Sequence, residues 1–424
     1  WHPARSGTNW MAPSDVPQWW AEHDGYLRCL SGKGNSALVF DYPLVGSGEL
    51  SVDLLTGGAW GSFSYGGVLI APRGLAFHDG TFPAMAIENI ITPTGSALVK
   101  PDVNRWTLRI ESGKNQVLNN GQLGYEIPGP SAAAPWLALC AWFRTDAAFR
   151  RLSISGDWRI PREVALVEGD CLVGWTGGFY DDAQTIRPAA NVPIGRGGRR
   201  VAYGQRSTAP NDPAPSVPGA AFRLAPPRPA NGGWFVKSGI IGAYVRTRDQ
   251  ATPDPIRLTY FRPLRNGEVL RYELFYQPGQ QMVHPALDRL TFLLEPEGVR
   301  LHWMTDHPDA EAGDLSLDNV ADEPDARRGP PRLPLVAGEW NRVALSLVDD
   351  EVVVELNGET IFRRKLEGTN DRLFSFFRYQ NETSARVRNV ALSGNWPEQI
   401  PQGDELFART RQWTDAERQA ESKL

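Results

Sequence analysis

Residues 339–368 read EWNRVALSLVDDEVVVELNGETIFRRKLEG, and this stretch decides the fold. Apolar and polar residues alternate from Val343 to Leu347, and again from Val352 to Leu356 after an acidic turn. An alternation with period two is typical of antiparallel strands that are buried on one face. The dipeptide Asn357-Gly358 supplies the positive φ angles of a tight hairpin. The sequence therefore predicts a meander of three strands, at 342–348, 351–356 and 359–366.

A second copy of this pattern lies upstream. Asn104 and Asn120 have the same separation as Asn341 and Asn357, and each pair consists of an Asn-Arg and an Asn-Gly dipeptide. The copies also end alike, with SGDW at 155–158 and SGNW at 393–396. Ordered matches of this kind are typical of internal repeats. We interpret the chain as a diverged duplication of one whole β domain.

The order of these features resembles the laminin G and concanavalin A type of jelly roll. The second copy carries the resemblance, with WNRV at 340–343, LNG at 356–358 and a closing RVRNV strand at 386–390. The ending LSGNWP at 392–397 is similar to the C-terminal lectin-like region of a family of large, uncharacterised bacterial secreted proteins. The resemblance implies an all-β fold of tandem antiparallel β-sandwiches. It leaves the function open, because such jelly rolls serve as lectins, glycan hydrolases, lyases and adhesion spacers.

The pattern along the chain divides it into five parts. We expect an N-terminal arm, a first jelly-roll domain, a connector rich in Pro, Gly and Arg that could add strands, a second jelly-roll domain, and a polar tail that forms a short C-terminal helix. Their ranges are 1–20, 21–161, 162–230, 231–401 and 402–424.

The composition of the chain limits the kinds of binding partner that we expect. The net charge of −5 and the dispersed Lys and Arg residues argue against a nucleic-acid partner. No apolar run is long enough to cross a bilayer. The chain begins at Trp1 without an initiator Met, which we interpret as a piece of a longer exported protein with further domains, located in the periplasm, at the cell surface or outside the cell. The three cysteines, Cys29, Cys140 and Cys171, fit either one disulfide plus a thiol or three reduced thiols.

No catalytic residues are predicted. A glycan hydrolase on this fold needs two carboxylates that flank the scissile bond, and the strand motif Glu-x-Asp-x-x-Glu is missing. The nearest acidic patterns are Glu49 with Asp53, and Glu351 with Glu355 and Glu359; they lie out of strand register or at hairpin turns. A lyase would need a His or Tyr base near an Arg.

Sugar binding requires an aromatic face for the apolar side of a pyranose and polar groups for its hydroxyls. Two groups of residues fit this need: the aromatic residues of the Gly-rich stretch 57–82, and His302 with Trp303 close to Arg300. The predicted carbohydrate-binding residues are Trp60, Phe63, Tyr65, His302 and Trp303. For each of them, packing in the sandwich is the competing interpretation.

Calcium is the one cofactor that the sequence suggests. Laminin G domains often hold this ion at the rim of the sandwich, where a hard cation finds oxygen ligands. The candidate ligands are Asp306, Asp309 and Asp314, in an acidic insert of the second copy. An ordinary acidic surface loop is the alternative.

Together these observations favour a non-catalytic carbohydrate-binding or adhesion module whose partner is a polysaccharide or glycan. One alternative is a glycan hydrolase or lyase whose catalytic groups meet only in three dimensions. The other is a structural scaffold without a ligand.

Overall fold

The computed structural model describes residues 1–5, 20–23, 25–29, 36–55, 61–71, 74–77, 100, 102–112, 114–127, 131–141, 147–170, 172–178, 222–223, 234–243, 257–280, 282–303, 320–321, 329–368, 370–378 and 386–401. Every regular element in these ranges is a β-strand, which confirms the all-β class. No helix among them is long and apolar enough to span a membrane. The helix predicted at 402–424 lies outside the described residues.

The C-terminal sandwich consists of two sheets. Its eight-stranded sheet has the order β17 (Trp234–Lys237), β18 (Ile240–Ala243), β29 (Arg386–Gly394), β20 (Glu268–Phe275), β25 (Trp340–Val348), β26 (Glu351–Leu356) and β27 (Glu359–Lys365), with β14 (Glu163–Ala165) also paired to β29. The facing sheet has the order β15 (Trp175–Gly178), β19 (Arg257–Pro263), β28 (Leu373–Phe377), β21 (His284–Leu287), β22 (Leu290–Glu295), β23 (Gly298–Trp303) and β24 (Val320–Ala321).

The predicted meander is present. Strands β25, β26 and β27 fall within two residues of the predicted bounds and pair in antiparallel order. Asn357 and Gly358 have φ angles of 52° and 87°, so the hairpin turn has the left-handed conformation that Asn-Gly favours. Local sequence pattern was therefore sufficient to place this part of the fold.

The N-terminal sandwich also consists of two sheets. Its eight-stranded sheet has the order β16 (Phe222–Arg223), β11 (Gln122–Ile127), β10 (Lys114–Asn119), β9 (Val103–Glu111), β5 (Val45–Leu55), β13 (Ala148–Arg159), β3 (Tyr26–Cys29) and β2 (Trp20–His23). The facing sheet has the order β1 (His2–Arg5), β4 (Ser36–Val39), β12 (Ala138–Ala141), β6 (Gly61–Tyr65), β7 (Val68–Ala71) and β8 (Gly74–Phe77).

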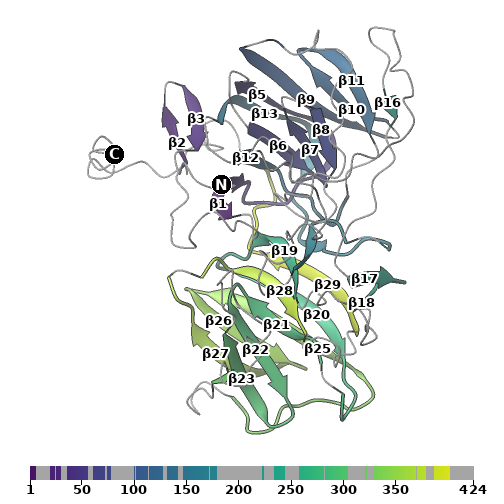
Figure 1. The fold of residues 1–424 in the computed structure, drawn as a ribbon, viewed down its shortest axis with the longest axis vertical. Helices are drawn as coiled ribbons and strands as arrows, with labels where there is room; N and C mark the ends of the chain where they lie inside the picture. The colour runs from purple at the N-terminus through teal and green to yellow at the C-terminus, as the bar shows by residue number, and fades with distance from the viewer. Residues whose placement is uncertain are drawn as a thin grey trace, which may run out of the picture.

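The two sandwiches share one connectivity, and they are stacked along the long axis of the molecule (Figure 1). In the N-terminal sandwich the chain runs from β3 to β4 in the facing sheet, returns at β5, crosses for β6 to β8, returns for β9 to β11, crosses at β12 and ends at β13. In the C-terminal sandwich β18 to β29 repeat every one of these crossings, apart from the added short strand β24. Repeated alternation between two sheets is the connectivity of a jelly roll.

Strands also form in the N-terminal arm, in the connector and in the Gly-rich stretch 57–82. The arm is not wholly irregular, because His2–Arg5 forms β1 and pairs with β4. Within the connector, β14 and β15 pair with β29 and β19 of the C-terminal sandwich. The Gly-rich stretch 57–82 contains strands β6, β7 and β8. The pairing of β1 with β4, of β14 with β29 and of β15 with β19 joins distant segments, which local periodicity does not report.

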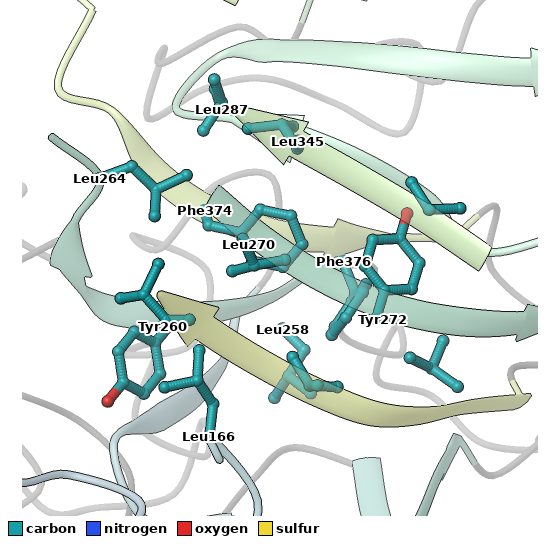
Figure 2. Packing of buried hydrophobic residues seen from close by; sticks show 14 of the residues in the cluster. Leu166, Leu258, Tyr260, Leu264, Leu270, Tyr272, Leu287, Leu345, Phe374 and Phe376 are labelled. Carbon is teal, nitrogen blue, oxygen red and sulfur yellow. The ribbon is translucent and has the colours of Figure 1, made fainter. Parts of the chain in front are cut away.

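Aromatic and aliphatic side chains fill the space between the sheets of the C-terminal sandwich (Figure 2). Tyr272 and Phe376 form an edge-on pair with ring centroids 5.0 Å apart, and Phe374 lies 4.9 Å from Phe376 in the same arrangement. Leu166, from the connector, packs in the same core. Part of the connector is thus integral to this sandwich.

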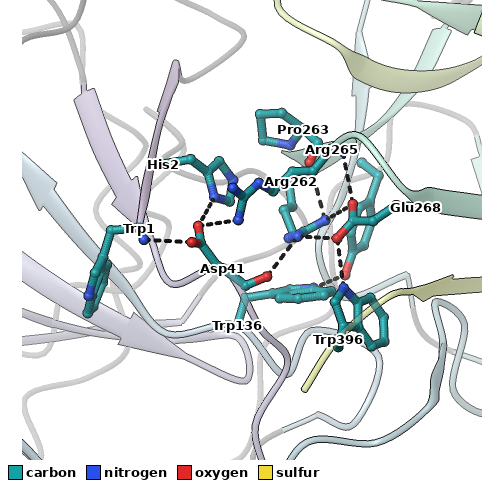
Figure 3. Close-up of polar contacts among 10 residues, drawn as sticks. Trp1, His2, Asp41, Trp136, Arg262, Pro263, Arg265, Glu268 and Trp396 are labelled. Atoms are coloured by element: carbon teal, nitrogen blue, oxygen red, sulfur yellow. Dashed lines mark hydrogen bonds and ion pairs between the residues drawn. The ribbon is translucent and has the colours of Figure 1, made fainter. Parts of the chain in front are cut away.

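A buried polar network joins the two sandwiches (Figure 3). Arg262 of β19 is fully buried and donates to both carboxylate oxygens of Glu268, at 2.6 and 2.7 Å. The same guanidinium donates to the carbonyl oxygen of Asp41 at 3.1 Å and lies 3.9 Å from the ring centroid of Trp136. The indole of Trp136 donates to the Tyr260 hydroxyl at 2.8 Å. These contacts fix one sandwich against the other.

Candidate functional site

Each eight-stranded sheet has one apolar face and one polar face. In β25 the core residues are Val343, Leu345 and Leu347, so the alternate residues, starting at Trp340 and Arg342, point away from the core. The outward residues of β20, β25 and β29 converge on one area, which we call the C-terminal cluster. It consists of Glu273, Phe275, Trp340, Arg342, Arg386, Arg388 and Asn389.

Glu273 is the acidic centre of the C-terminal cluster. Its carboxylate accepts hydrogen bonds from Arg388 Nε at 2.6 Å and from Asn389 Nδ2 at 3.1 Å. Arg342 Nε lies 3.8 Å from its other oxygen. The side chain of Glu273 is 18% exposed and that of Arg342 is 84% exposed, so the carboxylate lies beneath the guanidinium groups.

Two aromatic rings flank this acidic centre. Phe275 and Trp340 are both half-buried and meet edge to face, with ring centroids 5.5 Å apart. The Arg388 guanidinium lies 4.1 Å from the Trp340 ring centroid, and that of Arg386 lies 3.7 Å from the Phe275 centroid. The cluster therefore presents aromatic surface next to hydrogen-bond donors and acceptors.

The N-terminal sandwich carries an equivalent arrangement, which we call the N-terminal cluster. Its residues are Tyr26 and Arg28 on β3, Asp53 on β5, Arg105 on β9, and Arg150 and Arg151 on β13. Asp53 is fully buried and accepts hydrogen bonds from three arginines: Arg105 Nη1 at 3.0 Å, Arg150 Nε at 3.3 Å and Arg151 Nε at 2.6 Å. The guanidinium groups of Arg150 and Arg28 lie 4.9 and 5.5 Å from the Tyr26 ring centroid.

Strand register shows that the two clusters occupy the same place in each sheet. Asp53 pairs with Arg105 across β5 and β9, as Glu273 pairs with Arg342 across β20 and β25. On the third strand, Asp53 pairs with Arg150 and Glu273 with Arg388. The residue after each of these arginines, Arg151 or Asn389, has a positive φ angle, 48° or 54°, at an irregularity in the strand pairing.

These irregularities explain why a single carboxylate has several donors. A β-bulge leaves two successive side chains on the same face of a strand. Phe149 and Leu152 of β13 both belong to the core, so Arg150 and Arg151 between them both point outwards. The bulge thereby brings two donors to Asp53 from one strand.

An asparagine pair fixes the strand that carries Arg105 or Arg342. Asn357 Nδ2 donates to Asn341 Oδ1 at 2.8 Å, and Asn357 Oδ1 accepts from the Arg342 amide at 2.9 Å. Asn120 and Asn104 repeat these contacts at 2.9 and 3.1 Å, with the Arg105 amide as donor. The repeated Asn-Arg and Asn-Gly dipeptides of the sequence are therefore parts of one hydrogen-bonded unit in each sandwich.

Three of the aromatic and histidine residues singled out from the sequence are buried. Phe63 is fully buried, and Tyr65 is 5% exposed and donates its hydroxyl to the Leu44 carbonyl at 2.5 Å. His302 is fully buried, with its ring 5.3 Å from that of Phe377. Packing therefore accounts for Phe63, Tyr65 and His302 in this structure.

The other two predicted sugar-binding residues are Trp303 and Trp60. Trp303 is half-buried against the core, and the Arg364 guanidinium lies 5.1 Å from its ring centroid. Trp60 lies outside the described residues. The structure does not bring Trp303 together with Phe63 and Tyr65, which belong to the core of the N-terminal sandwich.

The candidate calcium ligands Asp306, Asp309 and Asp314 also lie outside the described residues. Among the residues that are described, no group of three or more His, Cys, Asp or Glu side chains is placed to hold a metal ion. Cys29 and Cys140 are both buried, and burial raises the pKa of the Cys140 thiol to about 12.

The carboxyl groups with shifted pKa values are arranged for ion pairing. Burial opposes ionisation of Glu268, but the Arg262 charge together with hydrogen bonds from Arg262, Trp396 and the Arg265 amide holds the pKa of Glu268 below its usual range. Burial likewise opposes ionisation of Asp41, and hydrogen bonding from His2 together with the Arg265 charge holds the pKa of Asp41 well below its usual range. Hydrogen bonds from Arg372 and Asn266 lower the pKa of the exposed Asp350. All three groups are therefore ionised at neutral pH.

The strand carboxylates considered from the sequence also have cationic partners. Glu49 pairs with Arg109 at 2.7 Å, and Glu351 lies 3.6 Å from Arg363. Sequence reasoning did not identify either cluster as a site. The matching positions of Arg150 and Arg388 in the two copies were a signal, but the acid that each arginine contacts is more than ninety residues away in sequence.

Comparison with solved structures found chains of low sequence identity. A putative glycosyl hydrolase from Parabacteroides distasonis is 16% identical, with a TM-score of 0.24, over 38% of this chain and 83% of that chain. The carbohydrate binding module CBM66 from Bacillus subtilis is 14% identical, with a TM-score of 0.24, over 35% and 97%. Domains LG4-5 of the mouse laminin alpha1 chain are 13% identical, with a TM-score of 0.21, over 90% and 93%.

The curated proteins compared with the chain gave no match. Family models did match. The region that ends in LSGNWP falls within one of these matches, which confirms the resemblance of that region to a domain family of unknown function. Two parts of the chain match family models. Residues 255–399 match a domain of unknown function, DUF1583_N, and residues 107–207 match a protein family of unknown function, DUF1581.

Proposed function

We propose that the chain is a non-catalytic carbohydrate-binding or adhesion module of an exported protein, and that the C-terminal cluster is its glycan site. The observation that carries the proposal is the half-buried pair Phe275 and Trp340 on an outward sheet face, next to Glu273, Arg388 and Asn389. Aromatic rings bind the apolar face of a pyranose, and neighbouring charged and amide groups bind its hydroxyls.

The pKa values support binding rather than hydrolysis. A glycosidase requires one carboxyl group that stays protonated at the working pH, so that it can act as general acid. The three carboxyl groups in the described residues with clearly shifted pKa values, Asp41, Glu268 and Asp350, are all shifted downwards. None of these three carboxyl groups has the raised pKa that a general acid needs, which supports the binding function over the hydrolase.

We further propose that the two sandwiches arose by duplication of one domain. Their strand order, their asparagine pairs and the positions of Asp53 and Glu273 support this origin. The Gly, Pro and Trp content, 42, 34 and 15 residues, is in keeping with an extracellular, periplasmic or surface location. The partner we propose is a polysaccharide.

Affinity electrophoresis in gels that contain neutral, uronic or sulfated polysaccharides tests the function. We expect at least one polymer to retard the chain, and Trp340→Ala to weaken binding about fivefold or more, because the indole is the larger of the two paired rings of the cluster. Stacking on one aromatic side chain contributes about 1 kcal/mol or more, so its loss is measurable. The melting temperature of the variant must stay near that of the wild type.

Trp303→Ala is the matched control, since Trp303 is also a half-buried tryptophan of the C-terminal sandwich but lies on the facing sheet. Loss of binding in Trp303→Ala alone would move the site to the edge of that sheet. Absence of retardation by every polymer would refute the carbohydrate-binding function and leave the structural scaffold.

A further inference from the structure

We propose that the two clusters are a pair of binding sites for the acidic groups, carboxylate or sulfate, of one class of polysaccharide. This inference rests on the proposed function. It adds a second site in the N-terminal sandwich and restricts the ligand to acidic glycans. Its basis is an excess of arginine over carboxylate in both clusters.

In the N-terminal cluster, the single carboxylate lies beneath the arginines. Asp53 has no exposed surface, whereas the side chains of Arg105, Arg150 and Arg151 are 35%, 37% and 66% exposed. Asp53 neutralises one of these three charges, and each guanidinium has five N–H donors. The buried acid therefore holds the arginines in position. Arg105 also donates to the Arg151 carbonyl and to the Ser153 hydroxyl, and part of each of the three arginine side chains stays exposed to solvent.

The C-terminal cluster has the same imbalance. Glu273 contacts Arg388 and Arg342, and Arg386 adds a third positive charge beside Phe275. Within the described part of the chain, Arg386 makes one weak hydrogen bond, to Gln277 at 3.5 Å, and its buried Nε has no partner. Among the described residues, this guanidinium is held by its stacking on the Phe275 ring and not by a carboxylate.

Arg28 has the same properties in the N-terminal cluster. It stacks on Tyr26, and its buried Nε also lacks a hydrogen-bond partner among the described residues. Arg28 pairs with Ala148 across β3 and β13, and Ala148 occupies the position in β13 that Arg386 occupies in β29. A ring-stacked arginine thus lies at one place in both sheets, although a different strand supplies it in each.

This combination fits an acidic glycan better than a neutral one. A guanidinium binds a carboxylate or sulfate through two parallel N–H donors, while a neighbouring ring can contact the sugar face. The chain as a whole carries a net charge of −5, so nonspecific attraction to a polyanion is not expected. Binding of a polyanion would require local positive areas such as these two clusters.

The test compares polygalacturonate, the same polymer with its carboxyl groups reduced to alcohols, and dextran sulfate in affinity electrophoresis. The variants are Arg28→Gln, Arg386→Gln and the double variant, chosen because neither arginine has an ion pair with a carboxylate within the described residues. Arg363→Gln is the control for Arg386→Gln: it removes the same charge from the same eight-stranded sheet, on β27 away from the cluster, although Arg363 also lies 3.6 Å from Glu351.

We expect retardation by polygalacturonate, by dextran sulfate or by both, and none by the reduced polymer. Each single variant should weaken binding about tenfold, as expected for a lost hydrogen bond to a charged group. The double variant should weaken it further, and Arg363→Gln should bind like the wild type. Raising the salt concentration should weaken binding of the wild type.

Equal retardation by the reduced polymer would overturn the inference, as would unchanged binding of the double variant. If Trp340→Ala still lost binding in either case, the proposed carbohydrate-binding function would stand without the acidic specificity. If none of the neutral, uronic or sulfated polymers retarded the chain, the proposed function and this inference would both fail.

Discussion

At the scale of single residues, His284 is the clearest source of pH dependence. Burial, followed by the positive charges of His302 and Arg300, lowers the pKa of His284 from 6.5 to about 3. The Nδ1 atom of His284 accepts a hydrogen bond from the Leu294 amide at 3.1 Å, so the neutral ring is the form that fits the fold. An unfolded chain would bind a proton at this position well before the folded one.

The sign of the effect follows from this difference. Between pH 6.5 and about 3 the unfolded state binds more protons at His284, so the free energy of unfolding falls as the pH falls. The full contribution is about 5 kcal/mol, at about 1.36 kcal/mol per pKa unit. In His284→Asn the amide oxygen can still accept from Leu294, but the titration is absent.

We therefore expect the free energy of unfolding of His284→Asn to decline less steeply between pH 6.5 and 3 than that of the wild type. Denaturant titrations at a series of pH values measure both curves. Parallel curves would mean that His284 does not contribute to acid destabilisation.

At the scale of elements, the asparagine pair explains how a hairpin is joined to the strand before it. Asn341 is fully buried and accepts hydrogen bonds from the Val336 amide and from Asn357 Nδ2, both at 2.8 Å. Its own Nδ2 donates to the carbonyls of Val336 and Glu339, both at 3.0 Å. One side chain thus satisfies backbone groups at the start of β25 and holds the β26–β27 turn against that strand.

Asn341→Ala should lower the free energy of unfolding by about 3 kcal/mol, because several hydrogen bonds are lost and buried backbone groups are left without partners. Asn104→Ala should have a similar effect in the N-terminal sandwich, where Asn104 bonds to Lys100 and Asn120. Chemical denaturation of each variant measures the change. Asn395→Ala, at an exposed position, is the control and should stay within about 0.5 kcal/mol of the wild type.

At the scale of the whole molecule, the sequence predicted those strands and turns whose formation depends on residues close to one another in the chain. The alternation around Val343 and the Asn357-Gly358 turn placed the meander within two residues of β25, β26 and β27. The Gly-rich context of Phe63 suggested an accessible loop, but β6 pairs on both edges and directs Phe63 into the core. The contact of Asp53 with Arg151 depends on the β5–β13 pairing, which no local pattern reports.

The junction between the sandwiches shows the same dependence on distant contacts. Arg262 and Glu268 form a buried ion pair in the C-terminal sandwich, and Arg262 also donates to Asp41 of the N-terminal sandwich. The Trp396 indole donates to the carboxylate of Glu268 at 2.9 Å. Because one guanidinium bonds to groups of both sandwiches, we expect the two sandwiches to unfold together.

Glu268→Gln tests this coupling, since it leaves the fully buried Arg262 without a carboxylate partner. Removing one member of a buried ion pair costs about 3–5 kcal/mol, whereas replacing both members with apolar residues can be nearly neutral. Scanning calorimetry should therefore show one transition at a clearly lower temperature for Glu268→Gln. The double variant Arg262→Met, Glu268→Leu should recover most of the lost stability. If calorimetry instead resolved two transitions and only one of them shifted, the junction would not couple the sandwiches, because the loss of a shared contact must lower the stability of both partners.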